Sequence, residues 1–419
     1  MGVSGAFGGA VKPLKKWRLF KATDYVSLMY PCFELLRIYG FFPYKITSGS
    51  TMVSSKLGYI YSTLLTGLNF GLMCFLLYQM DVSHKLQYAS VPGYLQGNCY
   101  VVLGCSIAFV SYVYSSKRMR LLCDLAELSA RLPSSSFTQV TKIVHAKDIL
   151  GFFFLVAQYG NIYSEEATVI VSKILAMYIT VVVYLVDTLY VDSVIVLRVC
   201  FERVNDNLIA LKDSICTEDP HLLRRVYHKQ KNPLLLLEIR AMKKQHNDIS
   251  EVVQRLNSTF SLQIVATVTL TFAEITFSLY FYILQTVGFQ SIDLKTQIWF
   301  CYFITSVTYY SVKMASIVWA CETAKAQAIK TGIIVHEALI GTTDKQVKEE
   351  LQLFSLQLLH RDNSFQAKGL SLDATLITAI VGGIATYLLI LIQFLVAGKT
   401  SNPDSQTTPI PIMTSTPGD

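Results

Sequence analysis

The stretch IATYLLILIQFLVAGKT (Ile384–Thr400) lies near the end of the chain and is strongly apolar. With the residues before it, it forms a segment from 374 to 397 that is long enough for one helical crossing of a bilayer. This segment nevertheless contains Thr386 and Gln393, which share one stripe of a helix with Ile390. A glutamine amide in hydrocarbon is costly unless it reaches a partner or water. We therefore expect the stripe to face something wetter than lipid.

Composition places the whole chain in a membrane. Of its 419 residues, 52% are hydrophobic and only 16% are charged, whereas soluble domains average about 25% charged residues. The nine cysteines are scattered, without the spacing of a disulfide framework or a zinc site. Enzyme motifs such as GxSxG, HExxH or a glycine-rich phosphate loop do not occur in the sequence. We expect no catalytic residue, metal or cofactor, which leaves a receptor, a channel or a transporter.

Seven segments are long and apolar enough to be membrane spans. The third is the shortest and is interrupted by Asn161. An apolar stretch before the first span contains Pro31, Arg37, Gly40 and Pro43, which predict a helix lying in the interface or dipping into it rather than crossing. The sequence thus predicts an all-α membrane protein with seven transmembrane helices. The predicted spans are 57–80, 93–114, 149–166, 168–197, 258–288, 296–320 and 374–397.

The positions of Lys and Arg predict the orientation. Of the 36 Lys and Arg residues, 31 fall in the N-terminal segment and in alternate connections, and four fall on the other side. The remaining one, Lys313, lies within the sixth span. Because the positive side faces the cytosol, we expect a cytosolic N-terminus and an extracellular C-terminus. This orientation is the reverse of that of a G-protein-coupled receptor.

The predicted organisation has five parts. Residues 1–56 form the cytosolic N-terminus with its interfacial or re-entrant helix. Residues 57–320 hold spans one to six, a ligand pocket and cytosolic helical extensions. Residues 321–373 form a cytosolic anchor segment, and 374–397 form the seventh span. Residues 398–419, rich in Pro, Thr and Ser, have little apolar surface to bury and are expected to be a disordered extracellular tail.

Several spans are expected to continue into the cytosol as helices. Neither Gly nor Pro occurs between Pro233 and Gly288, and a helix of that length would measure about 80 Å, against about 30 Å for the hydrocarbon core. Thr343 and Gln346 fit a capping box that opens a further helix. Such a bundle packs on itself or also joins subunits, and the pattern fits both. The apolar positions with helical spacing are Ile249, Val252, Val253, Leu256, Val347, Leu351, Phe354 and Leu358.

Charged residues inside the predicted spans have two interpretations. They line a functional cavity, or they form pairs between helices that fix packing. We interpret Asp187, Asp192 and Lys313, all in the cytosolic halves of their spans, as packing pairs. Glu274 lies in the middle of the fifth span, and both interpretations stay open for it.

The outer halves of spans two to six are rich in aromatic, amide and hydroxyl side chains. Such groups are what a pocket for a small polar or amphipathic molecule needs, although an interfacial aromatic belt explains Trp299 equally well. Thr305 and Tyr309 lie about 9 and 15 Å further along a helix from Trp299, which favours the pocket for both. The candidate pocket residues are Tyr94, Gln158, Asn161, Glu274, Tyr280, Gln285, Trp299, Tyr302, Thr305 and Tyr309.

The segment FQAKGLSLDATLITAIVGGIATYLLILIQF (365–394) resembles the signature of insect gustatory receptors. That signature has an F-x-A-x-G-L segment before the last span, then Thr-Tyr, five apolar residues and Gln-Phe. The matching positions are Phe365, Ala367, Gly369, Leu370, Thr386, Tyr387, Gln393 and Phe394.

The resemblance implies a ligand-gated, non-selective cation channel that assembles as a homotetramer, or as a heteromer with related receptors, in the plasma membrane of sensory neurons. It implies that the last span lines the pore, that Gln393 and Phe394 constrict its outer end, and that Thr386 and Ile390 continue the stripe inward. It also implies a pocket for a tastant within spans two to six and an anchor between subunits. The implied partners are a small-molecule tastant, membrane lipid and permeant cations, with no nucleic acid.

Other functions stay open at this point. A seven-span transporter would show internal repeats, and the two halves of the sequence are not similar to each other; a non-conducting auxiliary subunit is a further alternative. The ligand is expected to be a bitter or other non-sugar compound, because the last span does not resemble the main sugar-receptor branch. A sugar-responsive channel is the alternative.

Overall fold

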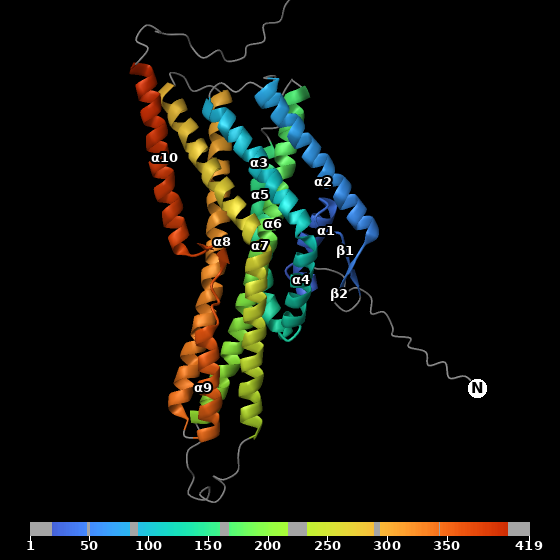
Figure 1. The fold of residues 1–419 in the computed structure, drawn as a ribbon, viewed down its shortest axis with the longest axis vertical. Coiled ribbons are helices and arrows are strands. Elements are labelled where there is room, and N and C mark those ends of the chain that lie inside the picture. The colour runs from blue at the N-terminus through green and yellow to red at the C-terminus, as the bar shows by residue number, and fades with distance from the viewer. Residues whose placement is uncertain are drawn as a thin grey trace, which may run out of the picture.

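The computed structural model describes residues 19–47, 51–83, 91–159, 167–216, 233–288, 294–342 and 344–400. The fold is an elongated bundle of helices with two small antiparallel hairpins (Figure 1). The expected all-α class is therefore corrected to a mostly helical one. The helices are α1 (Tyr25–Ile38), α2 (Lys56–Leu77) with a π-helical turn η1 (Tyr78–Val82), α3 (Val91–Val113), α4 (Ser115–Ser129), α5 (Ser134–Tyr159), α6 (Ala167–Cys216), α7 (Pro233–Gly288), α8 (Leu294–Gly341), α9 (Lys345–His360) and α10 (Ala374–Thr400).

The seven predicted spans lie in α2, α3, α5, α6, α7, α8 and α10. Among the described residues, five of these helices are long and apolar enough to cross a membrane: α2 with η1, α3, α6, α7 and α10. The other two, α5 and α8, lack a sufficiently long apolar window, for physical reasons. The apolar part of α5 begins only after Lys147 and Asp148, and the upper half of α8 is interrupted by Thr, Ser and Tyr. Residues 160–166 of the third predicted span and 401–419 of the predicted tail lie outside the described part of the chain.

Three helices run the full length of the molecule. α6, α7 and α8 have 50, 56 and 48 residues, and at 1.5 Å per residue α7 is about 84 Å long. Their lower ends pack with α9 into what we call the basal bundle (Figure 1). The positions with helical spacing form its core, as the sequence predicted. Ile249, Val253, Leu256, Leu351 and Phe354 are fully buried there.

The hairpin between α9 and α10 explains the F-x-A-x-G-L segment. Strands β3 (Gln366–Ala367) and β4 (Leu370–Ser371) pair antiparallel, and Phe365 and Ala367 are buried against the bundle. The two turn residues, Lys368 and Gly369, have φ of +52° and +85°. A two-residue loop with positive φ at both positions is a type I′ turn, which explains the glycine.

Polar contacts fix this hairpin and the start of α10. The Asn257 side chain on α7 donates from Nδ2 to the Ser364 carbonyl at 2.8 Å, and its Oδ1 accepts from the Gln366 N–H at 3.3 Å. The Glu322 carboxylate on α8 accepts from the first N–H of α10, that of Ala374, at 3.0 Å. α9 begins one residue later than a Thr343 cap would place it, because Asp344 is the N-cap. α10 is thus attached to α7 and α8 at its lower end.

The N-terminal part contains a hairpin that the sequence analysis did not predict. α1 is capped by Asp24, whose side chain accepts from the Ser27 N–H, and it buries Phe33 and Leu36 completely against the bundle. It is followed by strands β1 (Tyr44–Thr47) and β2 (Thr51–Ser54), which pair antiparallel. α1 therefore packs one face against the bundle, while Leu35 and Ile38 remain exposed; its position in or near the membrane interface stays a prediction.

α10 contacts the rest of the protein along one stripe. Gly383 lies so close to Phe272 of α7 that an added Cβ would come within 3.0 Å of the ring. One turn further on, the Tyr387 ring meets the same Phe272 edge-on, with 5.7 Å between centroids. Ile384 lies between these two contacts and is buried. Only 6% of the apolar window of α10 is buried, so most of this helix is left uncovered by its own chain.

Candidate functional site

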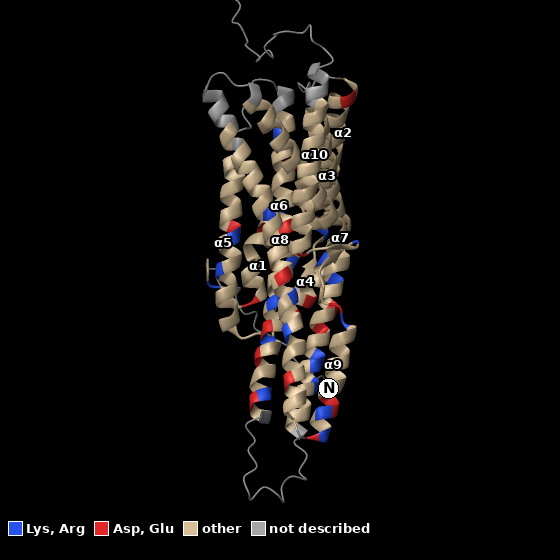
Figure 2. Ribbon diagram, turned by 90° about the vertical axis from the view of Figure 1, so that its left-hand side faces the viewer, with Lys and Arg blue, Asp and Glu red and all other residues tan. Residues whose placement is uncertain are grey.

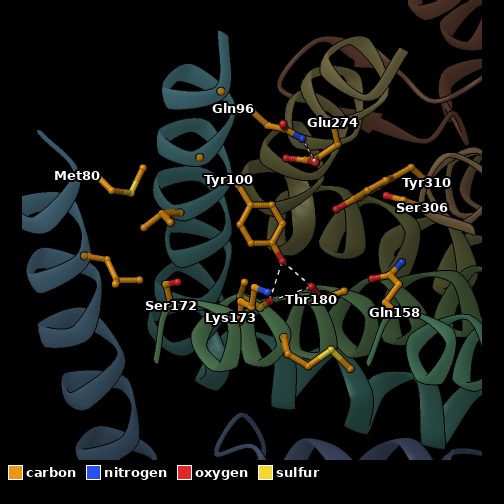
Figure 3. Close-up of a pocket in the computed structure, with 16 residues that line it drawn as sticks. Met80, Gln96, Tyr100, Gln158, Ser172, Lys173, Thr180, Glu274, Ser306 and Tyr310 are labelled. Atoms are coloured by element: carbon orange, nitrogen blue, oxygen red, sulfur yellow. Dashed lines mark hydrogen bonds between the residues drawn. The ribbon is translucent and has the colours of Figure 1, made fainter. Parts of the chain in front are cut away.

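A cavity of about 260 Å³ lies among the upper parts of η1, α3, α5, α6, α7 and α8. We call it the upper cavity. Its polar lining comes from five helices, and Figure 3 draws the side chains that line it. This lining includes Gln96 and Tyr100 of α3, Gln158 of α5, Ser172, Lys173 and Thr180 of α6, Glu274 of α7, and Ser306 and Tyr310 of α8.

The polar groups of the upper cavity are held by contacts between helices. Gln96 donates from Nε2 to Glu274 Oε2 at 3.0 Å, and Glu274 is 7% exposed. The Tyr100 hydroxyl donates to the Ala176 carbonyl at 2.8 Å and also meets the Thr180 hydroxyl. The buried Nε2 of Gln158 has no hydrogen-bond partner among the described residues. The cavity thus offers a carboxylate, a free amide donor and aromatic faces to a small molecule.

The structure brings some predicted pocket residues together and leaves others apart. Glu274 and Gln158 line the upper cavity, and Tyr309, which is 3% exposed, lines a second cavity described below. Tyr280 is buried against Phe281.

The remaining candidates are not in that lining. Gln285 is exposed, Tyr94 is half-buried, and the Thr305 hydroxyl donates to the Cys301 carbonyl of its own helix. The side chains of Trp299 and Tyr302 and the whole of Asn161 lie outside the described residues.

The expected pocket included the span in α6, but none of the residues that α6 contributes to the upper cavity was among the candidates. Ser172, Ala176 and Thr180 recur every four residues and therefore lie on one face of the helix. These small residues leave the space that larger side chains would fill. Small and hydroxyl residues at helical spacing in an otherwise bulky apolar span are the signal that could have found this face.

The charged groups within the spans form pairs, as the sequence predicted for three of them. Lys313 Nζ of α8 lies 3.4 Å from Asp187 Oδ2 of α6. The other Asp187 oxygen accepts from Gln263 at 3.2 Å and from Thr267 at 2.9 Å, both on α7. Asp192 of α6 pairs in the same way with Lys147 of α5, at 3.1 Å. These pairs connect four helices near the middle of the molecule.

The polar stripe of α10 faces away from its own chain. Thr386 and Gln393 are exposed, and Ile390 and Phe394 are 39% and 73% exposed. Part of this stripe is satisfied locally, because the Thr386 hydroxyl donates to the Gly382 carbonyl at 2.9 Å. No described contact covers the Gln393 amide. Within the described part of the chain, no cluster of His, Cys, Asp and Glu could hold a metal ion.

Known proteins share this sequence pattern. Residues 29–397 match the model of the 7tm chemosensory receptor family. “Putative gustatory receptor 28b” of Drosophila melanogaster is 37% identical over 153 residues, which make up 36% of this chain and 32% of that protein. “Gustatory receptor for bitter taste 66a” of the same fly is 30% identical over 165 residues, 39% of this chain and 31% of the relative. The matched segments thus span about a third of the length of these relatives.

A solved structure shares the fold. The insect olfactory receptor OR5 from Machilis hrabei, in complex with eugenol, superposes with a TM-score of 0.64 at 12% identity, over 87% of this chain and 97% of that one. A second structure of the same receptor gives a TM-score of 0.63. At this identity the likeness concerns the fold. Because the family match covers most of its length, the chain belongs to the 7tm chemosensory receptor family, a non-enzymatic family of multi-pass membrane proteins that here includes Drosophila gustatory receptors.

Proposed function

We propose that the protein is a gustatory receptor that acts as a ligand-gated, non-selective cation channel, with four copies arranged around a central pore lined by α10. The observation that carries this proposal is the exposure of α10: an apolar helix with 6% of its window buried carries a polar stripe that its own chain does not cover. A stripe with Thr386 and Gln393 is costly against lipid, and a shared aqueous axis satisfies it. The family membership supports the same arrangement.

Gln393 and Phe394 form the outer constriction in this proposal. They lie in the last described turns of α10 at the upper end of the molecule, and both are exposed. A ring of phenylalanine side chains closes a pore by excluding water, and a ring of amides next to it discriminates weakly between cations. Ile390 and Thr386 continue the lining one and two turns below.

The distribution of charge supports a cytosolic N-terminus. Figure 2 shows Lys, Arg, Asp and Glu gathered over the lower part of the bundle, whereas the described upper parts of the helices carry few of them. The basal bundle then lies in the cytosol, and the upper cavity opens on the outer side. We place the receptor in the plasma membrane of sensory neurons. Contacts of the basal bundle and the hairpin between copies hold the tetramer.

The upper cavity is the proposed tastant site. Its buried Glu274 carboxylate is suited to a protonated amine or a hydroxyl donor, and Tyr100 and Tyr310 offer ring faces. A non-sugar, bitter compound is favoured, and the match to a relative named for bitter taste agrees with this choice. A relative named for sugar taste also matches, at 26% identity over 170 residues, so a sugar-responsive channel is the second candidate.

The deciding experiment measures cation current from the receptor expressed alone in cells whose G-protein signalling is blocked. A panel of bitter amines and sugars should evoke current in the wild type. Glu274→Gln should raise the half-maximal concentration of an amine at least about tenfold, because a charged hydrogen bond is lost, with the maximal current unchanged. Gln285→Ala, at an exposed position away from the cavity, is the matched control. A receptor that reaches the surface and never conducts would be an auxiliary subunit or a transporter.

A second experiment tests the pore. In a background in which the exposed Cys74 and Cys301 are replaced by serine, Gln393→Cys should make ligand-evoked current sensitive to charged thiol reagents applied from outside. Val381→Cys is the control, because Val381 is 61% exposed and lies about 120° around the helix from position 393. If the reagents leave Gln393→Cys current unchanged although the cysteine is labelled, the glutamine does not line the pore.

A further inference from the structure

A second cavity, of about 180 Å³, lies between α5, α6 and α8. We call it the lateral cavity. Along α6 it begins one helical turn below the upper cavity, since Thr180 lines the upper cavity and Tyr184 the lateral one, whereas along α8 the two cavities overlap, since Tyr310 lines the upper cavity and Tyr309 the lateral one. The rest of its lining is largely apolar and includes Leu150 and Val312.

Two donor groups in the lateral cavity lack hydrogen bonds among the described residues, while an acceptor without one, Asp187 Oδ2, faces Lys313 in their ion pair. The hydroxyl of Tyr309, a residue that is 3% exposed, has no partner among the described residues. Lys313 Nζ forms an ion pair with Asp187 at 3.4 Å but no hydrogen bond within the described part of the chain. An ammonium group can donate three hydrogen bonds. Leaving a buried donor unsatisfied is costly, so both groups favour an occupant that supplies an acceptor.

The lateral cavity is separate from the upper one. The Tyr309 and Tyr310 rings meet edge-on, with 5.1 Å between centroids, and Tyr310 lines the upper cavity while Tyr309 lines the lateral one. Lys313 Nζ lies 5.7 and 5.1 Å from the centroids of the same two rings. This pair of rings and the ammonium group form the wall between the cavities, so a molecule can occupy either cavity alone.

The lateral cavity reaches the side of the bundle. Among its lining residues, Leu150 of α5 is 49% exposed and Val312 of α8 is 37% exposed. Both belong to predicted membrane spans, so the outer wall faces hydrocarbon rather than water. A molecule that partitions into the bilayer reaches the cavity between α5 and α8 without passing through the upper cavity.

We propose that the lateral cavity is a second small-molecule site, which takes a neutral, ring-sized molecule with one hydrogen-bond acceptor oxygen from the bilayer. The size follows from the volume, because an apolar cavity of about 150 Å³ takes one benzene molecule. The acceptor follows from the Tyr309 hydroxyl and the Lys313 ammonium. Neutrality follows from the ion pairs already present, since Lys313 is paired with Asp187, and Lys147 with both Asp192 and Asp148; a charged ligand would add a further buried charge without a partner of its own.

The test uses acetophenone, an aromatic ketone of this class whose excited carbonyl forms covalent adducts with neighbouring C–H groups. The purified full-length receptor in lipid nanodiscs is irradiated with acetophenone, and adducts are located by peptide mass spectrometry. We expect saturable labelling of α5 and α8 around the cavity. Cyclohexyl methyl ketone should compete for this labelling at least about tenfold better than isopropenylcyclohexane, in which a CH₂ group replaces the oxygen.

Two substitutions sharpen the test. Val312→Trp should fill the mouth and remove the saturable labelling, whereas Ile304→Trp, at a 58% exposed position of the same helix, should leave it. Tyr309→Phe removes the hydroxyl that donates to the ketone, so the ketone should lose part of its advantage over the alkene in competing for the labelling. Labelling that does not saturate, spreads over the exposed residues of α5 and α8 and ignores Val312→Trp would overturn the proposal, as would equal competition by ketone and alkene in the wild type. Since binding is measured rather than current, these results stand apart from those that test the channel.

Discussion

Acidification is expected to loosen the basal bundle through one buried histidine. His246 of α7 is fully buried and lies outside the predicted fifth span. It packs between the rings of Phe201 and Phe354, with centroid distances of 5.4 and 5.9 Å, and so joins α6 to α9. Burial, and secondarily the charge of Arg361, lowers the pKa of His246 from 6.5 to about 4.

The sign and size of the effect follow from this pKa. Below pH 6.5 the unfolded segment binds a proton that the packed bundle does not bind until about pH 4. Stability is therefore complete above pH 6.5, is lost as the pH falls towards 4, and is lost no further below that. At pH 5 the two pKa values give an opening equilibrium about 30-fold more favourable than at neutral pH, or about 2 kcal/mol.

Hydrogen exchange of the receptor in nanodiscs measures this opening. After correction for the pH dependence of the intrinsic exchange rate, peptides around position 246 and in α9 should lose about 30-fold of their protection between pH 8 and pH 5. His246→Phe keeps a ring between Phe201 and Phe354 and cannot titrate, so its protection should not change with pH. His360→Phe, at an exposed site of α9, controls for the loss of a histidine. The same pH dependence in His246→Phe as in the wild type would refute the reasoning.

Three further predictions concern the orientation, the pore and the hairpin. Asn257 is part of an Asn-Ser-Thr glycosylation sequon, but the proposed orientation puts it on the cytosolic side, so treatment with a glycosidase should not change the mass of the expressed receptor; a mass shift removed by Asn257→Gln would reverse that orientation. Phe394→Ala should increase current in the absence of ligand, because a smaller ring of side chains wets more easily; an unchanged basal current would contradict its place in the constriction. Gly369→Val should lower the yield of folded receptor, measured by size-exclusion chromatography, since positive φ costs a β-branched residue at least about 1 kcal/mol. Gly369→Asn should leave the yield nearly unchanged. Equal losses of yield in both variants would show that the positive φ at position 369 is not what requires glycine.

The long helices were predictable because their signal is repeated many times. The absence of Gly and Pro and the apolar spacing of Ile249, Val253 and Leu256 recur over several turns, so a local exception does not hide them. That Asp187, Asp192 and Lys313 form packing pairs was predictable for a different reason, although the partners were not. A buried charge in a span needs a partner of opposite charge, and the predicted spans contain few charged residues.

The hairpins and the division of the pocket were not predictable from these patterns. β3 and β4 have two residues each, too short for an alternating pattern, and a turn made by Lys368 and Gly369 lacks the Asn-Gly signal of a type I′ turn. Tyr309 and Tyr310 are neighbours in the sequence and line different cavities. Which cavity each one reaches depends on the rotation of α8 against α6, which is set by the whole interface between the two helices.

The unbroken course of α6, α7 and α8 constrains the length of the segments between the upper cavity and the basal bundle. One inserted or deleted residue in α7 between Asn257 and Glu274 would rotate everything beyond it by about 100° and shift it by about 1.5 Å. Asn257 could then not hold the hairpin while Glu274 faces Gln96. Many side chains in this stretch can be exchanged for others of similar size, but their number cannot change. The spacing between Asn257 and Glu274 therefore depends on the number of residues between them, because this part of α7 contains no loop that could accommodate an insertion or a deletion.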